Sequence, residues 1–269
     1  MVRFSWRRVW RTLVLAGAVC QPLPALDFVV TRYNDPFPDG CAPTDCSLRE
    51  ATIAANDSAG ADRILLSAGT YSLTRFGPDD VGALGDLDLL DVTEIVGPAA
   101  TMTRIDATPL GSASPDPVLT AFSDATLRGV TILGGASGGV RVAGADLTME
   151  ACEVMNNDFQ GNSAGVLATG GGTIVIRDSA IINNGSGLDA VGGSVTIGGC
   201  VVTTGGSVVI TGGVVVMMGG SVITGGVVVK GQSNCTLNGL TNGRSATEAR
   251  VQRPWFCGAA PSLPAGFSP

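Results

Sequence analysis

The sequence predicts an all-β protein, a right-handed parallel β-helix with coils of about 21 residues and a capping helix near its N-terminus. Two observations predict this fold. The segment 195–206 aligns with 216–226, so that Cys200 matches Ser221 one period later, and glycine pairs begin at 192, 198, 205, 212, 219 and 225. Three steps between glycine pairs make one period, as expected for a coil of three short strands and three bends. Glycine suits the bends, and the valine-rich segments between them suit strands.

Strand alternation within the repeats assigns an inner and an outer face. Cys152, Ser179 and Cys200 share one inward position on successive coils, and Val130 occupies it one coil before Cys152. Period-two alternation predicts further inward residues on the same strands: Met149, Val154, Asn156, Ile176, Ile181, Asn183, Ile197, Val202 and Thr204. It predicts these outward residues: Glu150, Glu153, Arg177 and Thr203. We expect the inward asparagines to hydrogen-bond the backbone and each other.

Two parts of the repeat region depart from a uniform coil. Cys152 and Ser179 are further apart in sequence than one regular period, which predicts a longer loop at 157–163. Loops on a rigid scaffold often carry function. The alternative for 205–232 is a repetitive glycine and valine tail that folds poorly. Residues 233–269 leave the repeat, and we expect Trp255 and Phe256 to fold back over the last coil as a cap.

The start of the chain predicts a secretory signal peptide at 1–25. Its apolar run, Leu13 to Val19, is too short to span a bilayer, which needs about 20 residues. Four arginines precede or border that run, as is typical of a signal peptide: Arg3, Arg7, Arg8 and Arg11. We therefore expect a secreted or cell-surface protein with no transmembrane segment in the mature chain. The mature chain is divided into three parts: an N-terminal segment at 26–60, the β-helix at 61–232 and a C-terminal tail at 233–269.

The composition excludes several classes of function. The chain has no histidine, which excludes a histidine base or histidine metal ligands. Without the signal peptide, 12 basic residues remain against 23 acidic ones, so the mature chain carries a net charge near −11. Such a charge repels phosphate backbones and anionic membrane surfaces. We expect no nucleic-acid partner, and we predict no cofactor and no metal site.

A capping helix is predicted directly after Cys46. Ser47 and Glu50 have the spacing of a capping box, in which each side chain binds a backbone N–H of the other residue. Four residues share one helix face at i, i+3, i+4 and i+7: Leu48, Ala51, Thr52 and Ala55. Asn56 and Gly60 are expected to end the helix. Two strands are predicted to follow, at 64–66 and, after a turn, within 68–73.

These residues also carry a resemblance to a known family. Four segments resemble the CSLREA-type segment that begins bacterial secreted right-handed β-helix proteins: 46–51 (CSLREA), 54–56, 62–64 and 68–71. The stretches 85–89 and 127–132 resemble what usually follows that segment. The resemblance covers most of 28–240. It implies a pectate-lyase-like solenoid, exported or on the cell surface and usually without an assigned activity.

Two interpretations apply to Arg49 and Glu50. The pair has the chemistry of a functional site, but we prefer a structural role, in which Glu50 caps the helix and the helix covers the open end of the solenoid. An uncovered end would expose strand edges and core, which is a liability for a repeat protein.

The cysteines predict two disulfides, because an oxidising compartment permits them. Cys41 and Cys46 are close in sequence, and Cys235 and Cys257 bracket a short tail, so we pair them in this way. Cys20 would leave with the signal peptide.

The two cysteines inside the repeats are expected to remain unpaired. Residues two coils apart lie roughly 9.6 Å apart, whereas a disulfide needs Cα atoms within about 7 Å. Cys152 and Cys200 are separated in this way, with Ser179 between them, so both are predicted to be buried thiols.

The candidate ligand-facing residues are Glu150, Glu153, Asp158, Arg177 and Asp178. A lyase or hydrolase on this fold would need carboxylates that converge on one outward face, for Ca²⁺ or for acid–base chemistry. In the repeat frame, however, Glu150 lies between Arg128 and Arg177 on successive coils. We therefore prefer a ladder of alternating charge. A second acidic group, Asp86, Asp88 and Asp91, alternates with leucines and is interpreted as a strand with a solvent face.

Three functional hypotheses follow. The first is a non-catalytic surface protein that acts in adhesion, surface display or carbohydrate binding, with a polysaccharide or another surface molecule as partner. The second is a polysaccharide lyase or glycoside hydrolase, which rests on fold analogy alone. The third is a shortened family member that has lost a C-terminal anchor.

Overall fold

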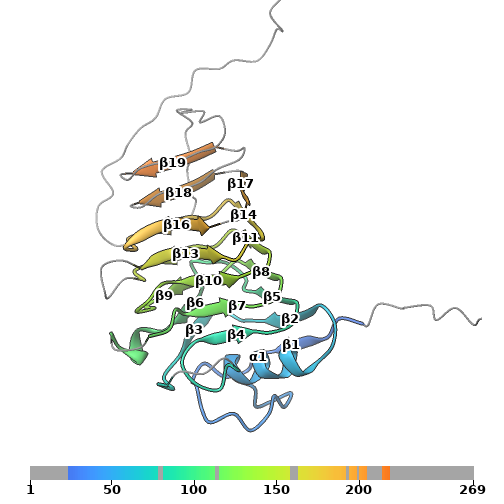
Figure 1. Ribbon diagram of the computed structural model, residues 1–269. Coiled ribbons are helices and arrows are strands. Elements are labelled where there is room, and N and C mark those ends of the chain that lie inside the picture. Colours follow the sequence, from blue (N-terminus) through green and yellow to red (C-terminus); the bar gives the residue numbers. More distant parts are fainter. Residues whose placement is uncertain are drawn as a thin grey trace, which may run out of the picture.

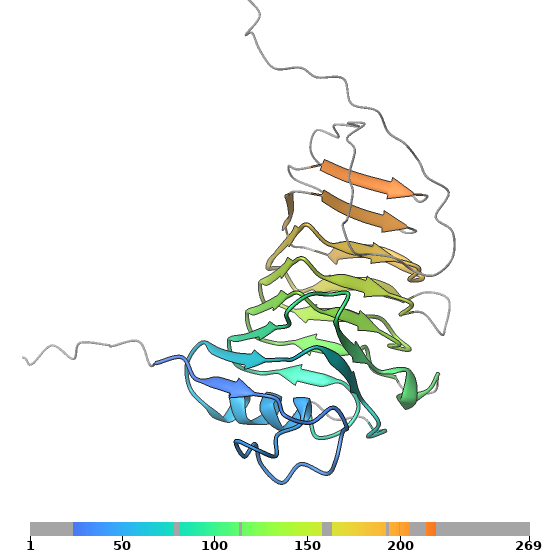
Figure 2. The same ribbon diagram turned by 180° about the vertical axis from the view of Figure 1, so that it is seen from behind.

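The computed structural model describes residues 24–77, 81–112, 115–157, 163–191, 194–198, 200–204 and 214–218. These residues form three parallel β-sheets, stacked strand upon strand along one axis (Figures 1 and 2). Over most of the solenoid, each coil contributes one strand to each of the three sheets, in the order sheet 1, sheet 2, sheet 3. The parallel β-solenoid expected from the sequence is therefore present.

The strands of each sheet are short, three to six residues long. Sheet 1 contains, in order, β1 (Asp27–Val29), β2 (Asp62–Leu65), β5 (Thr93–Val96), β8 (Ala125–Arg128), β11 (Leu147–Glu150), β14 (Thr173–Arg177) and β17 (Ser194–Gly198). Sheet 2 contains β3 (Gly69–Ser72), β6 (Thr103–Asp106), β9 (Thr131–Leu133), β12 (Glu153–Met155), β15 (Ala180–Ile182), β18 (Cys200–Thr204) and β19 (Val214–Met218). Sheet 3 contains β4 (Leu87–Leu89), β7 (Leu119–Ala121), β10 (Val140–Ala143), β13 (Ala164–Thr169) and β16 (Ser186–Val191). A short 3₁₀ helix, η1 (Thr108–Leu110), follows β6.

The helix α1 (Leu48–Asp57) lies across the N-terminal end of the stack (Figure 1). Ser47 caps it and forms both hydrogen bonds of the capping box with Glu50, which confirms that prediction. The four residues of the predicted helix face are all buried: Leu48, Ala51, Thr52 and Ala55. The helix ends at Asp57 with Ser58 as its cap, between the two predicted end residues. Since β1 already belongs to sheet 1, the first strand of the solenoid lies within the segment 26–60.

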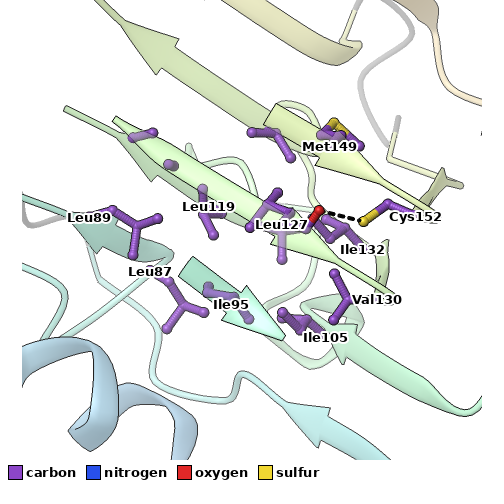
Figure 3. Close-up of a cluster of buried hydrophobic side chains, with 14 of the residues drawn as sticks. Leu87, Leu89, Ile95, Ile105, Leu119, Leu127, Val130, Ile132, Met149 and Cys152 are labelled. Atoms are coloured by element: carbon purple, nitrogen blue, oxygen red, sulfur yellow. Dashed lines mark hydrogen bonds between the residues drawn. The ribbon is translucent and has the colours of Figure 1, made fainter. Parts of the chain in front are cut away.

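The core fills the space between the three sheets with aliphatic side chains (Figure 3). In sheet 1, one inward column is in register across four strands and fully buried: Ile95, Leu127, Met149 and Ile176. Burying one such side chain contributes about 1.5–3 kcal/mol. The inward positions predicted at Met149, Cys152, Val154, Ile176, Ser179 and Ile181 are confirmed by their burial.

The register shows coils of unequal length. The step from Glu150 to its partner Arg177 is longer along the chain than the step from Thr131 to Glu153, as the loop predicted at 157–163 requires. Beyond β15 the register differs from the alignment. Ile181 pairs with Thr203 instead of Val202. The next step, from Cys200 to Val214, is shorter than the alignment of Cys200 with Ser221 predicts.

The buried asparagines are the neighbours of those that were expected. Asn156 and Asn183 are exposed and adopt φ of 55° and 53°, which is the left-handed region. This conformation interrupts the strand alternation, and asparagine tolerates it better than most residues. The following residues, Asn157 and Asn184, point inward and are buried. The prediction of Asn156 and Asn183 as inward residues was therefore wrong by one position.

Candidate functional site

Three of the sequence-predicted site residues lie on the outer face of sheet 1 or directly after one of its strands. Glu150 pairs in register with Arg128 on one side and with Arg177 on the other. Asp178 follows Arg177 directly and turns the chain towards sheet 2. Asp158 lies outside the described residues. The predicted stack of Arg128, Glu150 and Arg177 is thus confirmed.

The outer face of sheet 1 carries one charged side chain on each of six successive strands, with the sign alternating from strand to strand. We call this set the charge ladder: Asp27, Arg63, Glu94, Arg128, Glu150 and Arg177. Arg63 binds Asp27 through two hydrogen bonds of 2.8 and 2.7 Å. Arg128 donates to Glu94 at 2.6 Å and also forms an ion pair with Glu150. The ladder balances its own charge and brings no two acids to neighbouring strands.

The ladder is exposed, so its interactions are weakened by solvent. The side chain of Arg128 is 46% exposed, and those of Arg63 and Asp27 are 46% and 44% exposed. Surface ion pairs contribute little to stability for this reason. Hydrogen bonding to Arg63 lowers the pKa of Asp27, and the same pairing raises the pKa of Arg63. Both groups are thus held in their charged forms, which suits pairing and does not suit proton transfer.

Asp178 occupies a corner between sheets 1 and 2. It adopts φ of 46°, and the residues at the same corner of the preceding coils, Ala151 and Gly129, adopt φ of 52° and 59°. One left-handed residue therefore turns each of these coils. Aspartate enters this region more readily than most residues, so the conformation of the backbone explains why it stands here.

Glu153 differs from the expected exposed carboxylate. It lies on β12 and is only 8% exposed. The hydroxyl of Thr131 donates to the Ala100 carbonyl at 2.7 Å and lies 3.4 Å from Glu153 Oε2. Burial raises the pKa of Glu153, against the opposing effects of Thr131 and Arg104. The expectation of a solvent-facing carboxylate was therefore wrong, although a carboxyl group with a raised pKa is a candidate general acid.

A buried cluster under α1 connects residues that the sequence did not associate. The guanidinium of Arg49 is fully buried and donates to Asp35 at 2.7 and 3.1 Å. It also donates to the backbone carbonyls of Gly82, Gly85 and Asp86 at 2.8–3.0 Å. All five donors of the guanidinium are thus occupied.

Glu50 binds the amides of Ser47 and Asp39. These bonds hold its pKa below the usual value although burial opposes them. The polar groups of Arg49 and Glu50 are thus engaged within the protein itself.

The acidic strand β4 is buried on both faces. Asp86 and Asp88 are 3% and 1% exposed, which corrects the prediction of a solvent-facing strand. The amide of Gly82 donates to Asp88 at 2.9 Å, so the loop that contains Gly82 lies over this face. Thr120 donates to Asp86 Oδ2 at 2.6 Å. Burial raises the pKa of Asp86 to about 6, and the nearby charge of Asp116 acts in the same direction.

The polar interior of the solenoid is a short ladder of asparagines. Asn184 Oδ1 accepts hydrogen bonds from the backbone N–H and the side-chain amide of Asn157, at 3.0 and 3.1 Å. Asn157 also donates to the Ile132 carbonyl and accepts from the amide of Gly135. Glycines leave room for it, because a Cβ at Gly139 would lie 2.9 Å from Asn157 Nδ2. These amides are occupied by the protein itself.

A groove on the outer face of sheet 3 was missed by the sequence analysis. It has a volume of about 250 Å³ and lies over β10 and β13. Its lining includes Pro117, Ser137, Arg141, Leu167 and Thr169. No repeat motif marks these residues. Arg141, Leu167 and Thr169 are outward positions on strands that the core pattern defines only from the inside, and Pro117 and Ser137 lie in the segments before β7 and β10.

Within the described part of the chain, no group of three or more acidic or cysteine side chains is placed to hold a metal ion. Among the same residues, no helix is both long and apolar enough to cross a membrane. Cys41 and Cys46 form the predicted disulfide, and Cys152 is a buried free thiol as predicted. Cys235 and Cys257 lie outside the described residues.

No protein-family model, curated protein or solved structure matches this chain.

Proposed function

We propose that this chain is an exported, non-catalytic surface protein that acts in adhesion, surface display or carbohydrate binding. The observation that carries the proposal is the charge ladder. Glu150 and Arg177, two of the candidate ligand-facing residues, belong to it, and Arg128 is shared by two carboxylates on adjacent strands. Glu153 lies on a different sheet. A glycosidase needs two carboxyl groups facing one another across the substrate, and the ladder separates its acids by an arginine instead.

We also propose the handedness, the coil length and the family of the solenoid. We propose a right-handed winding, because crossovers between parallel strands are right-handed in nearly all proteins. The regular coil is taken as about 21 residues, a period that the pairing of β14 with β17 supports. The resemblance of 46–51 to the CSLREA-type segment supports membership of that family of secreted β-helix proteins, which resemble pectate lyases in fold.

Export is supported by two features of the chain. The residues 1–25 have the composition of a signal peptide. The disulfide between Cys41 and Cys46 would form and persist in an oxidising compartment. Fusion of residues 1–25 to a reporter enzyme that is active only after export tests this part of the proposal. Activity that is lost when Arg3, Arg7, Arg8 and Arg11 are replaced by glutamate would support it, and equal activity without residues 1–25 would refute it.

The alternative function is a polysaccharide lyase or glycoside hydrolase of the pectate-lyase-like type. The observation that favours it is Glu153, a mostly buried carboxyl group with a raised pKa near Arg104. A general acid has these properties. A partner carboxylate on the same face is missing among the described neighbours of β12, where the residues in register with Glu153 are Thr131 and Ala180.

The experiment that separates the two functions uses the purified mature chain and a panel of immobilised polysaccharides. We expect retention on at least one polymer, with no change in polymer length. Retention without cleavage would exclude the enzyme, whereas shortened chains would exclude the non-catalytic function. Absence of retention on the whole panel would contradict carbohydrate binding and leave adhesion through another surface partner to be tested with whole cells.

A further inference from the structure

The groove on sheet 3 contains an arginine whose position is set by the core. Val140 and Val142 on β10 are 1% and 0% exposed, so they point into the solenoid. Arg141 between them therefore points out of it and is exposed. In register, it is flanked by Thr120 on β7 and by Leu167 on β13. Figure 1 shows β7, β10 and β13 one above the other.

Arg141 forms no ion pair within the described part of the chain. The hydroxyl of its neighbour Thr120 donates a hydrogen bond to Asp86. Most of the other described arginines are engaged: Arg32 with Asp45, Arg49 with Asp35, Arg63 with Asp27, Arg128 with Glu94 and Glu150, and Arg75 over the ring of Phe37. In a chain of net charge −7, an unpaired guanidinium beside a hollow is a polar group available to a ligand.

We propose that this groove binds a single carboxylate group, with Arg141 as its cationic partner. A guanidinium presents two parallel N–H groups that match the two oxygens of a carboxylate. Leu167 and Pro117 supply apolar contact beside it. The hydroxyls of Ser137 and Thr169 donate to backbone carbonyls, so their oxygens can accept hydrogen bonds from the body of the ligand and do not compete with Arg141 for its carboxylate. A charged head with a small, partly apolar body fits this lining.

The size of the groove and the charge of the protein restrict the size and the charge of the expected ligand. A volume of about 250 Å³ lies below the usual range of about 300–1,000 Å³ for drug-sized ligands, so one amino-acid residue or one sugar ring is the expected unit. The acidic chain repels densely charged polyanions at long range. The ligand therefore carries an isolated carboxylate, such as the end of a peptide or a lone acidic sugar.

This inference rests on the proposed function, binding without cleavage, and deepens it by naming the ligand chemistry. The experiments distinguish a failure of the groove proposal from a failure of the proposed function. Loss of all groove binding would leave retention on a neutral polysaccharide untouched, whereas cleavage of a polymer would refute the proposed function whether or not the groove binds a carboxylate.

The test is a titration of the disulfide-intact mature chain, followed by NMR, with two matched pairs of probes. N-acetylalanine is compared with its amide, and glucuronate with glucose, so that each pair differs mainly in the carboxylate. We expect the carboxylates to shift the signals of β10 and β13 and to saturate in the millimolar range. Arg141→Gln should weaken binding about tenfold, as expected for the loss of a charged hydrogen-bonded partner.

Two further variants test whether the binding depends on this groove. Arg63→Gln removes an exposed arginine on sheet 1, away from the groove, and should leave binding of the probes unchanged. Leu167→Trp fills the groove and should also abolish binding while the circular dichroism spectrum stays native. Binding of only one carboxylate probe identifies the source as peptide or sugar and supports the proposal. The proposal is overturned if neither carboxylate binds, if the neutral probes bind equally well, or if Arg141→Gln binds like the wild type.

Discussion

The buried guanidinium of Arg49 donates two hydrogen bonds to the carboxylate of Asp35, at 2.7 and 3.1 Å. The same carboxylate accepts from the amides of Thr74 and Arg75. One buried ion pair thus connects α1, the segment before the disulfide and the chain after β3. We infer that this cluster anchors the N-terminal cap to the solenoid, in addition to the packing of Leu48, Ala51 and Ala55 against the core.

Removing the carboxylate from this ion pair should destabilise the protein strongly. Asp35→Asn leaves the Arg49 charge buried without its partner, and breaking a buried pair in this way typically costs about 3–5 kcal/mol. Urea denaturation of the mature chain measures the effect. The control is Asp27→Asn, which breaks the exposed pair with Arg63 and should cause a far smaller change. Equal effects of the two variants would refute the role assigned to Arg49.

Replacement by glycine should destabilise the protein at Asn157 and have little effect at the adjacent Asn156. Asn157→Gly removes the amide that binds Ile132, Gly135 and Asn184, and should cost at least about 2 kcal/mol, because buried partners are left unsatisfied. Asn156→Gly places glycine at φ of 55°, which glycine adopts readily, and should be close to neutral. Thermal unfolding of both variants provides the comparison. A larger loss from Asn156→Gly would mean that the inward residue is assigned to the wrong position.

The stability contributed by Asp86 should depend on pH. Its pKa in the folded protein is about 6, above the ordinary value of 3.8, so the protonated form favours folding. This contribution is therefore fully present below pH 3.8 and is lost as the pH rises through about 6. As the pH falls from 7 to 4, the free energy of unfolding of the wild type should rise by about 2–3 kcal/mol relative to that of Asp86→Asn. Chemical denaturation of both proteins across this range measures the difference, and a difference independent of pH would contradict the burial argument.

The thiol of Cys152 should be inert in the folded protein. It lies 3.2 Å from the Leu127 carbonyl in the core (Figure 3), and burial raises its pKa to about 12. Since the thiolate is the reactive form, alkylation at pH 8 should leave the peptide containing Cys152 unmodified until the protein is unfolded. Peptide mapping by mass spectrometry measures the extent of this alkylation directly. Cys152→Ala should be exported normally and cost only a modest packing loss, and rapid alkylation of native protein would contradict the assignment to the core.

The sequence predicted the features that depend on local spacing or on the core. The capping box of Ser47 and Glu50, the short disulfide and the inward column through Met149 all follow from patterns within a few residues or from strand alternation. The stacking of Glu150 between Arg128 and Arg177 followed from the repeat, because one coil fixes which residue lies above another.

Other features escaped because they depend on backbone conformation or on distant segments. A single left-handed residue at Asn156 shifts the inward position by one, and no composition signal distinguishes it from its neighbour. The partner of Arg49, Asp35, lies in an irregular segment before the disulfide. The groove beside Arg141 arises from outward residues of separate coils, whose identity the core does not constrain.

We propose that the carboxyl groups of this solenoid support its structure and do not catalyse cleavage. The most direct measurement incubates the mature chain with a polysaccharide panel and follows polymer length and new chain ends over time, in parallel with Glu153→Gln. We predict unchanged polymers for both proteins. Polymer shortening by the wild type that disappears in Glu153→Gln would contradict the claim and establish Glu153 as a catalytic acid.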